Sequence, residues 1–301
     1  MRPLRTKLIV VILLVTMLIS AIHGCAKPDN EIVINYAGSY SNAMLLIMKE
    51  KGIARKYFPD SKITWTHMAS SSEMRDAVVA NRVTFAGISL PSYFSAIEKG
   101  LKIESICYAG DTPIKIYMRK DSNRSYNDLK SDDKIALVGM NTILHIAFLV
   151  DAYHTFGDTS RFDSSLVVMP HAEGLSLISS GNQISGYITT FPTTYKADQT
   201  ENLVCVKDFT DTVKEYGIGS VVVVNDTVEE EKRKAFVGAM EESLKFIIEN
   251  TDEAAEIMSR DWNIPKDEII KVLNDMPPHV ELNDYSKLIE ILNQIGYLDE
   301  K

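Results

Sequence analysis

The feature that most constrains this chain is an alternation of short apolar runs with segments of helical spacing, which begins at residue 31. Most of the runs end in a turn rich in Gly, Ser, Thr or Asn, and a helical pattern follows the turn. This alternation predicts an α/β protein, in which mostly parallel sheets are flanked by helices. The expected strands are 31–36, 62–67, 83–88, 103–108, 114–118, 134–138, 166–169, 187–190 and 221–224.

Helical patterns fill the intervals between these strands and dominate the last part of the chain. The longest helical region begins at Glu229, and Pro265 fits the first turn of one of its helices. Val221–Val224 is a continuous apolar run just before that region, which indicates a strand buried on both faces. The other helices are expected near 44–51, 72–81, 93–99, 143–150, 175–179 and 285–295.

The N-terminus reads as an export segment. Three basic residues precede the apolar stretch 8–22, which is shorter than the ~20 residues that span a bilayer. Gly24-Cys25 follows at once and resembles a bacterial lipoprotein cleavage site, although His23 is unusual there. The resemblance implies a signal peptide over 1–24, a lipid on Cys25, a tether over 25–30 and an extracytoplasmic body. An uncleaved N-terminal anchor is the alternative.

Charge and cysteine content exclude several classes of protein, among them nucleic-acid-binding proteins and disulfide-rich domains. Residues 1–24 hold three basic side chains and no acidic one, so 29 basic and 41 acidic side chains remain, a net charge of −12. A body this acidic does not suit nucleic acid, which calls for a basic surface. Three cysteines cannot form a disulfide framework. Cys107 and Cys205 lie in apolar runs, so we expect buried thiols rather than a disulfide.

Common catalytic motifs are missing from the sequence. It contains no GxxxxGK[ST] phosphate loop, GxGxxG, HExxH or GxSxG. His145 and His154 share an expected helix at a spacing that does not place them well on one face. We therefore expect no metal site and no cofactor.

A resemblance to a known family runs along most of the chain from residue 31. It is carried, in chain order, by the segments 42–54, 85–91 with 96–100, 128–136, 180–187 and 237–255. These segments resemble the solute-binding lipoproteins of ABC importers, of the nitrate, sulfonate, taurine and thiamin-precursor group. Two departures stand out: Ser131-Asp132-Asp133 replaces a glycine turn, and the stretch ending at Gly186 lacks the family's aspartate.

This resemblance implies a two-lobe periplasmic-binding-protein fold of type II, with the binding cleft between the lobes. Lobe 1 would comprise 31–111 plus 218–301, and lobe 2 would comprise 112–217, with hinges at 110–112 and 216–219. It also implies a monomeric, non-enzymatic protein that captures a small solute and delivers it to permease subunits. A ligand-sensing partner of a membrane receptor and an enzyme similar to thiamin-pyrimidine synthases are the alternatives.

Candidate ligand contacts lie in the turns that follow the strands, because ligands of open α/β sheets bind beyond the carboxyl ends of the strands. Helix capping accounts for many of the same side chains. Helix N-termini suit an oxyanion such as a sulfonate or nitrate, but these turns contain no Arg or Lys. Their rings, with His67, equally suit a heterocycle such as a pyrimidine. The candidates are Ser39, Tyr40, Ser41, Ser71, Ser89, Tyr93, Asn141, Thr142, His171, Thr190 and Phe191.

Overall fold

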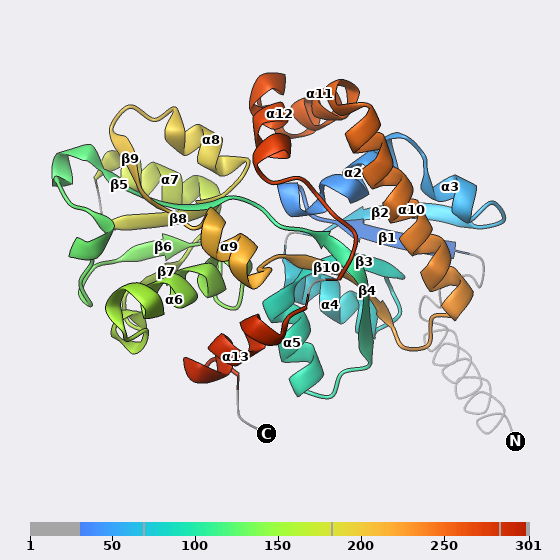
Figure 1. Cartoon of the computed structure of the whole chain (residues 1–301), viewed down its shortest axis with the longest axis horizontal. Coiled ribbons are helices and arrows are strands. Elements are labelled where there is room, and N and C mark those ends of the chain that lie inside the picture. Colours follow the sequence, from blue (N-terminus) through green and yellow to red (C-terminus); the bar gives the residue numbers. More distant parts are fainter. Residues whose placement is uncertain (1–30, 69, 182, 283, 299–301) are drawn as a thin grey trace, which may run out of the picture.

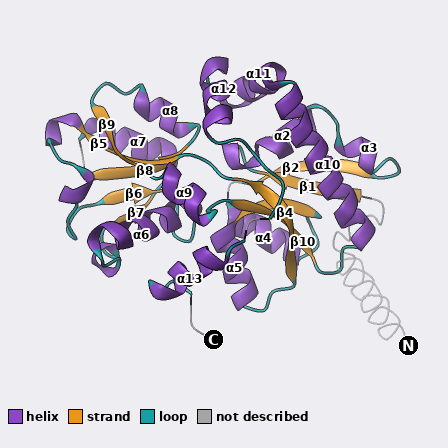
Figure 2. Ribbon diagram, viewed as in Figure 1, coloured by secondary structure: helices purple, strands orange, loops and turns teal. Residues whose placement is uncertain are grey.

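Two five-stranded sheets, each flanked by helices, make up the protein (Figure 1, Figure 2). The computed structural model describes residues 31–298 except 69, 182 and 283. The predicted signal peptide, the tether and Cys25 lie outside the described residues. Within the described part of the chain, no helix has the length and apolar character needed to cross a bilayer.

The first sheet has the strand order β2-β1-β3-β10-β4. β1 pairs in parallel with β2 and β3, and β10 lies between β3 and β4, antiparallel to both. All six residues of β10 are buried, which confirms the prediction of a strand covered on both faces. The strands are β1 (Glu31–Tyr36), β2 (Lys62–His67), β3 (Phe85–Ser89), β4 (Ile103–Gly110) and β10 (Ser220–Asn225).

The second sheet repeats this arrangement with the order β7-β6-β8-β5-β9. β6 is parallel to β7 and β8, while β5 is antiparallel to both β8 and β9. A mostly parallel sheet with one inserted antiparallel strand thus occurs twice, and the predicted α/β class is confirmed. The strands are β5 (Ile114–Arg119), β6 (Ile135–Leu137), β7 (Leu166–Val168), β8 (Gly186–Thr190) and β9 (Leu203–Asp208).

Helices cover both faces of each sheet. Figure 1 shows α2 and α10 on one side of the first sheet and α4 and α5 on the other. The α-helices are α2 (Ala43–Glu50), α3 (Ala54–Tyr57), α4 (Ser71–Val79), α5 (Leu90–Glu98), α6 (Ile143–Phe156), α7 (His171–Ser180), α8 (Thr193–Asp198), α9 (Thr210–Tyr216), α10 (Glu230–Glu249), α11 (Thr251–Trp262), α12 (Lys266–Asp275) and α13 (Ser286–Gln294). Short 3-10 turns are η1 (Tyr40–Asn42), η2 (Lys120–Ser122), η3 (Tyr126–Asp128) and η4 (Ser160–Phe162).

The chain crosses between the sheets twice, after Gly110 at the end of β4 and before Ser220 at the start of β10. These two residues are register partners, so the crossings lie side by side. A Cβ atom on Gly219 would lie 2.6 Å from the Gly110 carbonyl oxygen, and Gly110 itself has φ +141°. Only glycine meets both requirements readily. The crossings support the predicted lobe boundaries and hinges, which remain predictions.

The C-terminal segment contacts elements of both lobes. Tyr285, just before α13, packs edge-to-face against Phe94 of α5, with ring centroids 6.1 Å apart. From the same segment Gln294 donates to the Tyr153 hydroxyl of α6 at 2.7 Å. This segment therefore bridges the two lobes.

Cys107 and Cys205 are both free thiols, on β4 and β9 of different sheets. Burial raises the pKa of the Cys107 thiol to about 12. The prediction of unpaired thiols is confirmed, although Cys205 is only half-buried.

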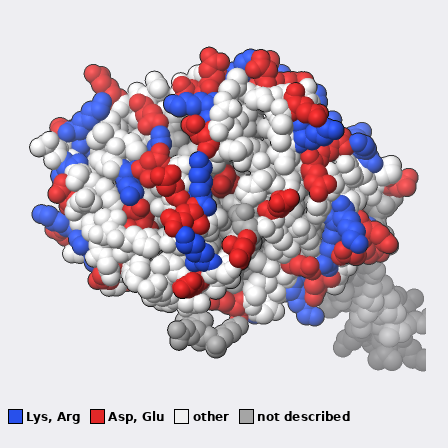
Figure 3. Space-filling model, in the orientation of Figure 1, with Lys and Arg blue, Asp and Glu red and all other residues white. Residues whose placement is uncertain are grey.

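On the molecular face in Figure 3, acidic and basic side chains are interspersed.

Candidate functional site

The turns at the carboxyl ends of strands from both sheets converge on one cavity of about 540 Å³, hereafter the interlobe cavity. That volume lies in the range of small-molecule sites. The first lobe contributes residues around Ser39, Ser71 and Ser89, and the second lobe contributes residues around Asn141 and His171. None of the described residues that line the cavity is Asp, Glu, Lys or Arg.

Ser89 supplies an unengaged hydroxyl to the first-lobe wall. It is the N-cap of α5 and is only 6% exposed, yet its Oγ has no hydrogen-bond partner among the described residues. Its backbone N–H donates to Ser71 Oγ at 3.1 Å, which fixes the position of the residue. Since a buried hydroxyl without a partner is unfavourable, a ligand atom that bonds to Ser89 removes that penalty.

The first turn of the same wall packs closely against β3. Ser39 and Ser41 place their hydroxyls 3.0 Å apart, and Asn42 Oδ1 accepts from the Ala37 N–H at 3.3 Å. A Cβ atom on Gly87 would lie 2.4 Å from Asn42 Oδ1, so a side chain at position 87 would displace this turn. Asn42 and Gly87 both line the cavity, and neither was among the predicted contacts.

Asn141 is held in a defined orientation in the second-lobe wall. Its φ is +57°, its N–H donates to His145 Nδ1 at 3.2 Å, and its Oδ1 accepts from the Tyr297 hydroxyl at 3.0 Å. The amide nitrogen of Asn141 is left as the donor of this side chain. Burial lowers the pKa of His145 to about 4, so its ring is neutral at pH 7 and accepts the Asn141 bond. Thr142 caps α6.

His171, the first residue of α7, is held through its Nδ1 atom. Nδ1 lies 3.0 Å from Thr189 Oγ1 and 3.2 Å from the Tyr187 hydroxyl, both on β8. The Tyr187 hydroxyl also lies 3.0 Å from the His171 carbonyl oxygen and 3.0 Å from Thr189 Oγ1. Burial lowers the pKa of His171 to about 4, so this ring is also neutral at pH 7.

Aromatic rings close one side of the interlobe cavity. Phe191 lines the cavity and meets Tyr40 and Trp262 edge-to-face, with centroids 6.0 Å away in each case. Tyr40 and Trp262 belong to the predicted lobe 1 and Phe191 to the predicted lobe 2. These rings therefore form an apolar contact across the lobe boundary. Beside Phe191, Thr190 Oγ1 lies 2.7 Å from Thr112 Oγ1 of the crossing segment.

Nine of the eleven predicted contacts line the interlobe cavity, and Tyr40 and Tyr93 do not. Tyr40 is 2% exposed and donates its hydroxyl to the Met276 carbonyl at 2.7 Å, so it stands behind Phe191. Tyr93 was expected in a turn, but α5 starts at Leu90 because its first turn accommodates Pro91. Tyr93 consequently lies inside the helix, beside Phe94. The nine are Ser39, Ser41, Ser71, Ser89, Asn141, Thr142, His171, Thr190 and Phe191.

Other lining residues carried weaker indications in the sequence. His67 was noted there as a possible ring partner and does line the cavity, at the end of β2. Thr112, in the predicted hinge 110–112, and Ser220, which directly follows the predicted hinge 216–219, also line the cavity. Tyr187, Thr189 and Tyr297 orient cavity residues without lining the cavity, and the sequence carried no indication of this role.

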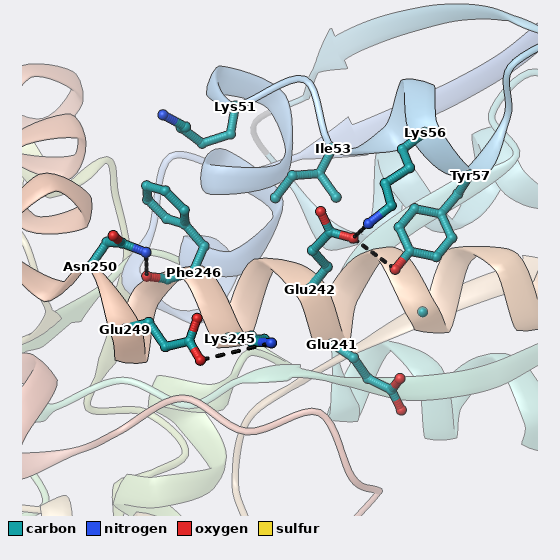
Figure 4. Close-up of a pocket in the computed structure, with 11 residues that line it drawn as sticks. Lys51, Ile53, Lys56, Tyr57, Glu241, Glu242, Lys245, Phe246, Glu249 and Asn250 are labelled. Atoms are coloured by element: carbon teal, nitrogen blue, oxygen red, sulfur yellow. Dashed lines mark hydrogen bonds and ion pairs between the residues drawn. The ribbon is translucent and has the colours of Figure 1, made fainter.

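A second hollow lies on the outer face of the first lobe, between α10 and the α2–α3 region (Figure 4). Its charged groups are largely paired with one another. Glu242 bonds to both Lys56 and the Tyr57 hydroxyl, and Lys245 pairs with Glu249. The Glu242 bonds join α10 to α3, and the Lys245–Glu249 pair lies within α10, so the hollow is a weaker candidate than the interlobe cavity. Among the described residues, no group of three or more His, Cys, Asp or Glu could hold a metal ion.

The chain matches no family model and no curated protein by sequence. Its structure is nevertheless similar to solved binding proteins. The alkanesulfonate-binding protein SsuA from Xanthomonas axonopodis pv. citri, bound to MOPS, is 16% identical, with a TM-score of 0.74 over 92% of this chain and 96% of that one. The periplasmic aliphatic sulphonate binding protein SsuA from Escherichia coli is 14% identical, with a TM-score of 0.71 over 89% and 86%.

The periplasmic nitrate-binding protein NrtA from Synechocystis PCC 6803 is 18% identical, with a TM-score of 0.64 over 82% of this chain and 70% of that one. At these identities the similarity is one of fold. It agrees with the family resemblance drawn from the sequence. The chain has the two-lobe fold of periplasmic solute-binding proteins.

Proposed function

We propose that the protein is the solute-binding component of an ABC-type importer and captures a small polar organic solute between its lobes. The interlobe cavity carries this proposal: strand-end turns of both lobes line one space of about 540 Å³ with hydroxyl, amide and imidazole groups. A solute held there contacts both lobes at once and thereby stabilises the closed arrangement. The permease would recognise that arrangement.

The lining favours a neutral solute or a singly charged anion. Helices α4, α6 and α7 each begin with residues that line the cavity, so the positive ends of their dipoles lie beside the same space. An oxyanion beside Ser89 would gain hydrogen bonds there without a guanidinium partner. A flat heterocycle would instead use Phe191 as a wall. Both solute classes expected from the sequence, the organic oxyanion and the flat heterocycle, are compatible with this lining.

A thermal-shift panel on the purified protein tests the proposed function. The panel contains taurine, ethanesulfonate, nitrate, bicarbonate, 4-aminopyrimidine and riboflavin. A solute at ~100 times its Kd stabilises the native state by about 2.7 kcal/mol. For a chain of this size the melting temperature then rises by roughly 5–10 °C. A solute that binds equally well when Ser89 and His171 are both replaced by Ala would contradict the assignment of the cavity.

We further propose that a lipid on Cys25 anchors the protein on the outer side of the membrane, as the lipoprotein-like segment implies. Replacement of Cys25 by Ser is expected to release the protein from the membrane fraction into the soluble fraction. Quantitative fractionation of cells that express each form measures the effect. Retention of Cys25→Ser on the membrane would favour the uncleaved anchor instead.

A further inference from the structure

Phe191 lines the interlobe cavity and also lines a separate hollow behind it. We propose that the Phe191 ring is a fixed partition between these two spaces, and that it sets the length of the solute that the protein accepts. The proposal rests on the proposed function, because it assigns a specificity-determining residue to the same cavity. It follows from what lies on each side of the ring and from what holds the ring in place.

The separate hollow, hereafter the rear hollow, has a volume of about 300 Å³. It lies between α12 of the predicted lobe 1 and residues of β5, α8, β9 and α9 of the predicted lobe 2. Unlike the interlobe cavity, it is lined by several Asp, Glu and Lys side chains. Lys115 Nζ lies 3.1 Å from Asp198 Oδ2, and Lys214 donates to the Asp275 carbonyl oxygen at 2.6 Å. An uncharged space and a charged space therefore meet at Phe191.

The wall between the two spaces is thin. Thr112 lines the interlobe cavity, and the next residue, Pro113, lines the rear hollow. Thr193 and Thr194, the first two residues of α8, divide between the two spaces in the same way. Among the described residues, Phe191 alone lines both. Its ring is therefore the part of the wall whose removal would join them.

Two other aromatic rings hold the Phe191 ring in place. It meets Tyr40 and Trp262 edge-to-face, and the centroids of those two rings are 6.2 Å apart, so the three rings form one cluster. The Tyr40 hydroxyl bonds to the Met276 carbonyl oxygen, which ties the cluster to the end of α12. The Phe191 N–H donates to the Pro113 carbonyl oxygen at 3.3 Å. All three rings are buried, so Phe191 is a fixed wall rather than a gate.

A phenyl ring at this position restricts the solute in two ways. Its surface offers van der Waals contact but no hydrogen bond to an oxygen or nitrogen acceptor, so we expect an apolar group at this end of the solute. Its bulk keeps that group out of the rear hollow. Beyond the ring, Pro113, Val272 and Met276 supply apolar surface to the rear hollow. Without the ring, a longer apolar group would extend from one space into the other.

Tryptophan fluorescence tests the partition without any solute. The chain contains two tryptophans, so in a Trp65→Phe background the signal comes from Trp262, which is 6% exposed and packs against Phe191. Phe191→Ala removes the ring and joins the two spaces. The acrylamide quenching constant of Trp262 should then rise by roughly twofold or more, because the indole loses its cover. Tyr195→Ala enlarges only the rear hollow and should leave that constant unchanged.

An unchanged quenching constant in a folded Phe191→Ala protein overturns the proposal, because neighbouring side chains then fill the place of the ring. An equal rise in Tyr195→Ala overturns it as well, since access to Trp262 would then not depend on the partition. Circular dichroism establishes that each variant is folded. Should Phe191→Ala fail to fold, Phe191→Leu decides the question. It keeps an apolar side chain but lacks the ring, so a smaller rise is expected, and no rise overturns the proposal.

Solute pairs of different length separate this inference from the proposed function. Titration calorimetry compares ethanesulfonate with hexane-1-sulfonate, and 4-aminopyrimidine with 4-aminoquinazoline. The ratio of the Kd of the longer member to that of the shorter member should fall by about tenfold in Phe191→Ala and stay unchanged in Tyr195→Ala. If a pair binds and its ratio is the same in Phe191→Ala, the inference fails and the proposed function stands. If neither pair binds, the quenching result alone decides the partition, and the wider panel decides the proposed function.

Discussion

Ser71 and His171 occupy equivalent places in the two lobes, but they place different kinds of polar group at the cavity. Each is the first residue of a helix, and each bonds to the residue 18 positions later, near the end of the next strand. In the first lobe the result is a row of small hydroxyls whose protons can rotate. In the second lobe it is an imidazole whose orientation is fixed by buried Tyr187 and Thr189.

This difference indicates a division of roles within the cleft. The first-lobe wall adapts to a ligand group, since Ser89 can either donate or accept. The second-lobe wall imposes a pattern, because Asn141 is fixed by Tyr297 and His171 by its β8 partners. Selectivity among similar solutes should then come mainly from the second lobe. The variants below test that division, in order of decreasing expected effect.

Acidification should destabilise the second lobe through His145. Its folded pKa of about 4 lies below the ordinary 6.5, so between those values the unfolded state binds more protons and stability falls as the pH falls. For a ring this buried the loss is about 3 kcal/mol at pH 4. His145→Gln should remove that loss while keeping an acceptor for the Asn141 N–H. Urea unfolding at pH 7 and pH 4 measures the difference.

Asp111, in the crossing segment, serves as a control because its contribution to folding stability should change with pH in the opposite direction. Burial raises the pKa of its carboxyl from 3.8 to about 6, so it favours the folded state at low pH and loses that contribution as the pH rises through 6. Asp111→Asn should therefore gain stability at pH 7 relative to the unmodified protein, and little at pH 4. If His145→Gln and the unmodified protein lose the same free energy on acidification, His145 is not the acid-sensitive group.

Gly174 of α7 packs closely against Tyr187, one of the residues that hold His171. A Cβ atom there would lie 2.6 Å from Tyr187 Cε2, and Tyr187 is 1% exposed. Gly174→Ala should cost about 2 kcal/mol of unfolding free energy, because overpacking outweighs the gain in helix propensity. It should also shift the His171 ring signals in NMR spectra of the ¹⁵N-histidine-labelled protein, because Tyr187 contacts His171 Nδ1. Urea unfolding and ¹⁵N-histidine spectra measure the two effects.

Gly238→Ala is the matched control in the first lobe. Its Cβ would lie 2.7 Å from Tyr57 Cε1, in the hollow of Figure 4, and the half-buried Tyr57 ring has more room to shift. A smaller loss of stability and unchanged His171 signals are expected. Equal disturbance of His171 by both variants would show that the fixed orientation does not depend on Tyr187 packing.

These contrasts also show what the sequence can and cannot predict. Ser39, Ser71 and Ser89 were predictable because each follows a strand with a clear apolar pattern, and such turns meet at one edge of a sheet. Tyr40 was misplaced because a ring beside a turn can enter the core as readily as the cleft. The hydrogen bond between Asn141 and Tyr297 joins residues 156 positions apart, and no local sequence pattern predicts it.

Ser89→Ala should weaken solute binding without weakening the fold. The Ser89 hydroxyl is buried without a partner, so its removal costs the folded protein almost nothing, while the bound solute loses a hydrogen bond. We expect about a tenfold higher Kd for a solute identified by the panel. Ser92 in the same helix also has a buried, unpartnered hydroxyl but does not line the cavity, so Ser92→Ala should leave the Kd unchanged. Similar Kd values for all three proteins would remove Ser89 from the site.

The smallest expected effect concerns the contact between the C-terminal segment and the second-lobe wall. Tyr297→Phe removes the donor to Asn141 Oδ1, a partly exposed bond worth about 0.5–1 kcal/mol. Tyr153→Phe removes the acceptor of the Gln294 bond, which also joins this segment to α6 but does not involve a cavity residue. Urea unfolding should show similar small losses of stability for both variants.

Solute binding should separate the two variants, because only Tyr297 orients a cavity side chain. In Tyr297→Phe the Asn141 amide is free to rotate and loses its fixed donor direction, so a two- to threefold higher Kd is expected in calorimetry. Tyr153→Phe should retain the original Kd. Equal Kd values would mean that the C-terminal segment joins the lobes without shaping the cleft, and the imposed pattern of the second-lobe wall would then reside in His171 alone.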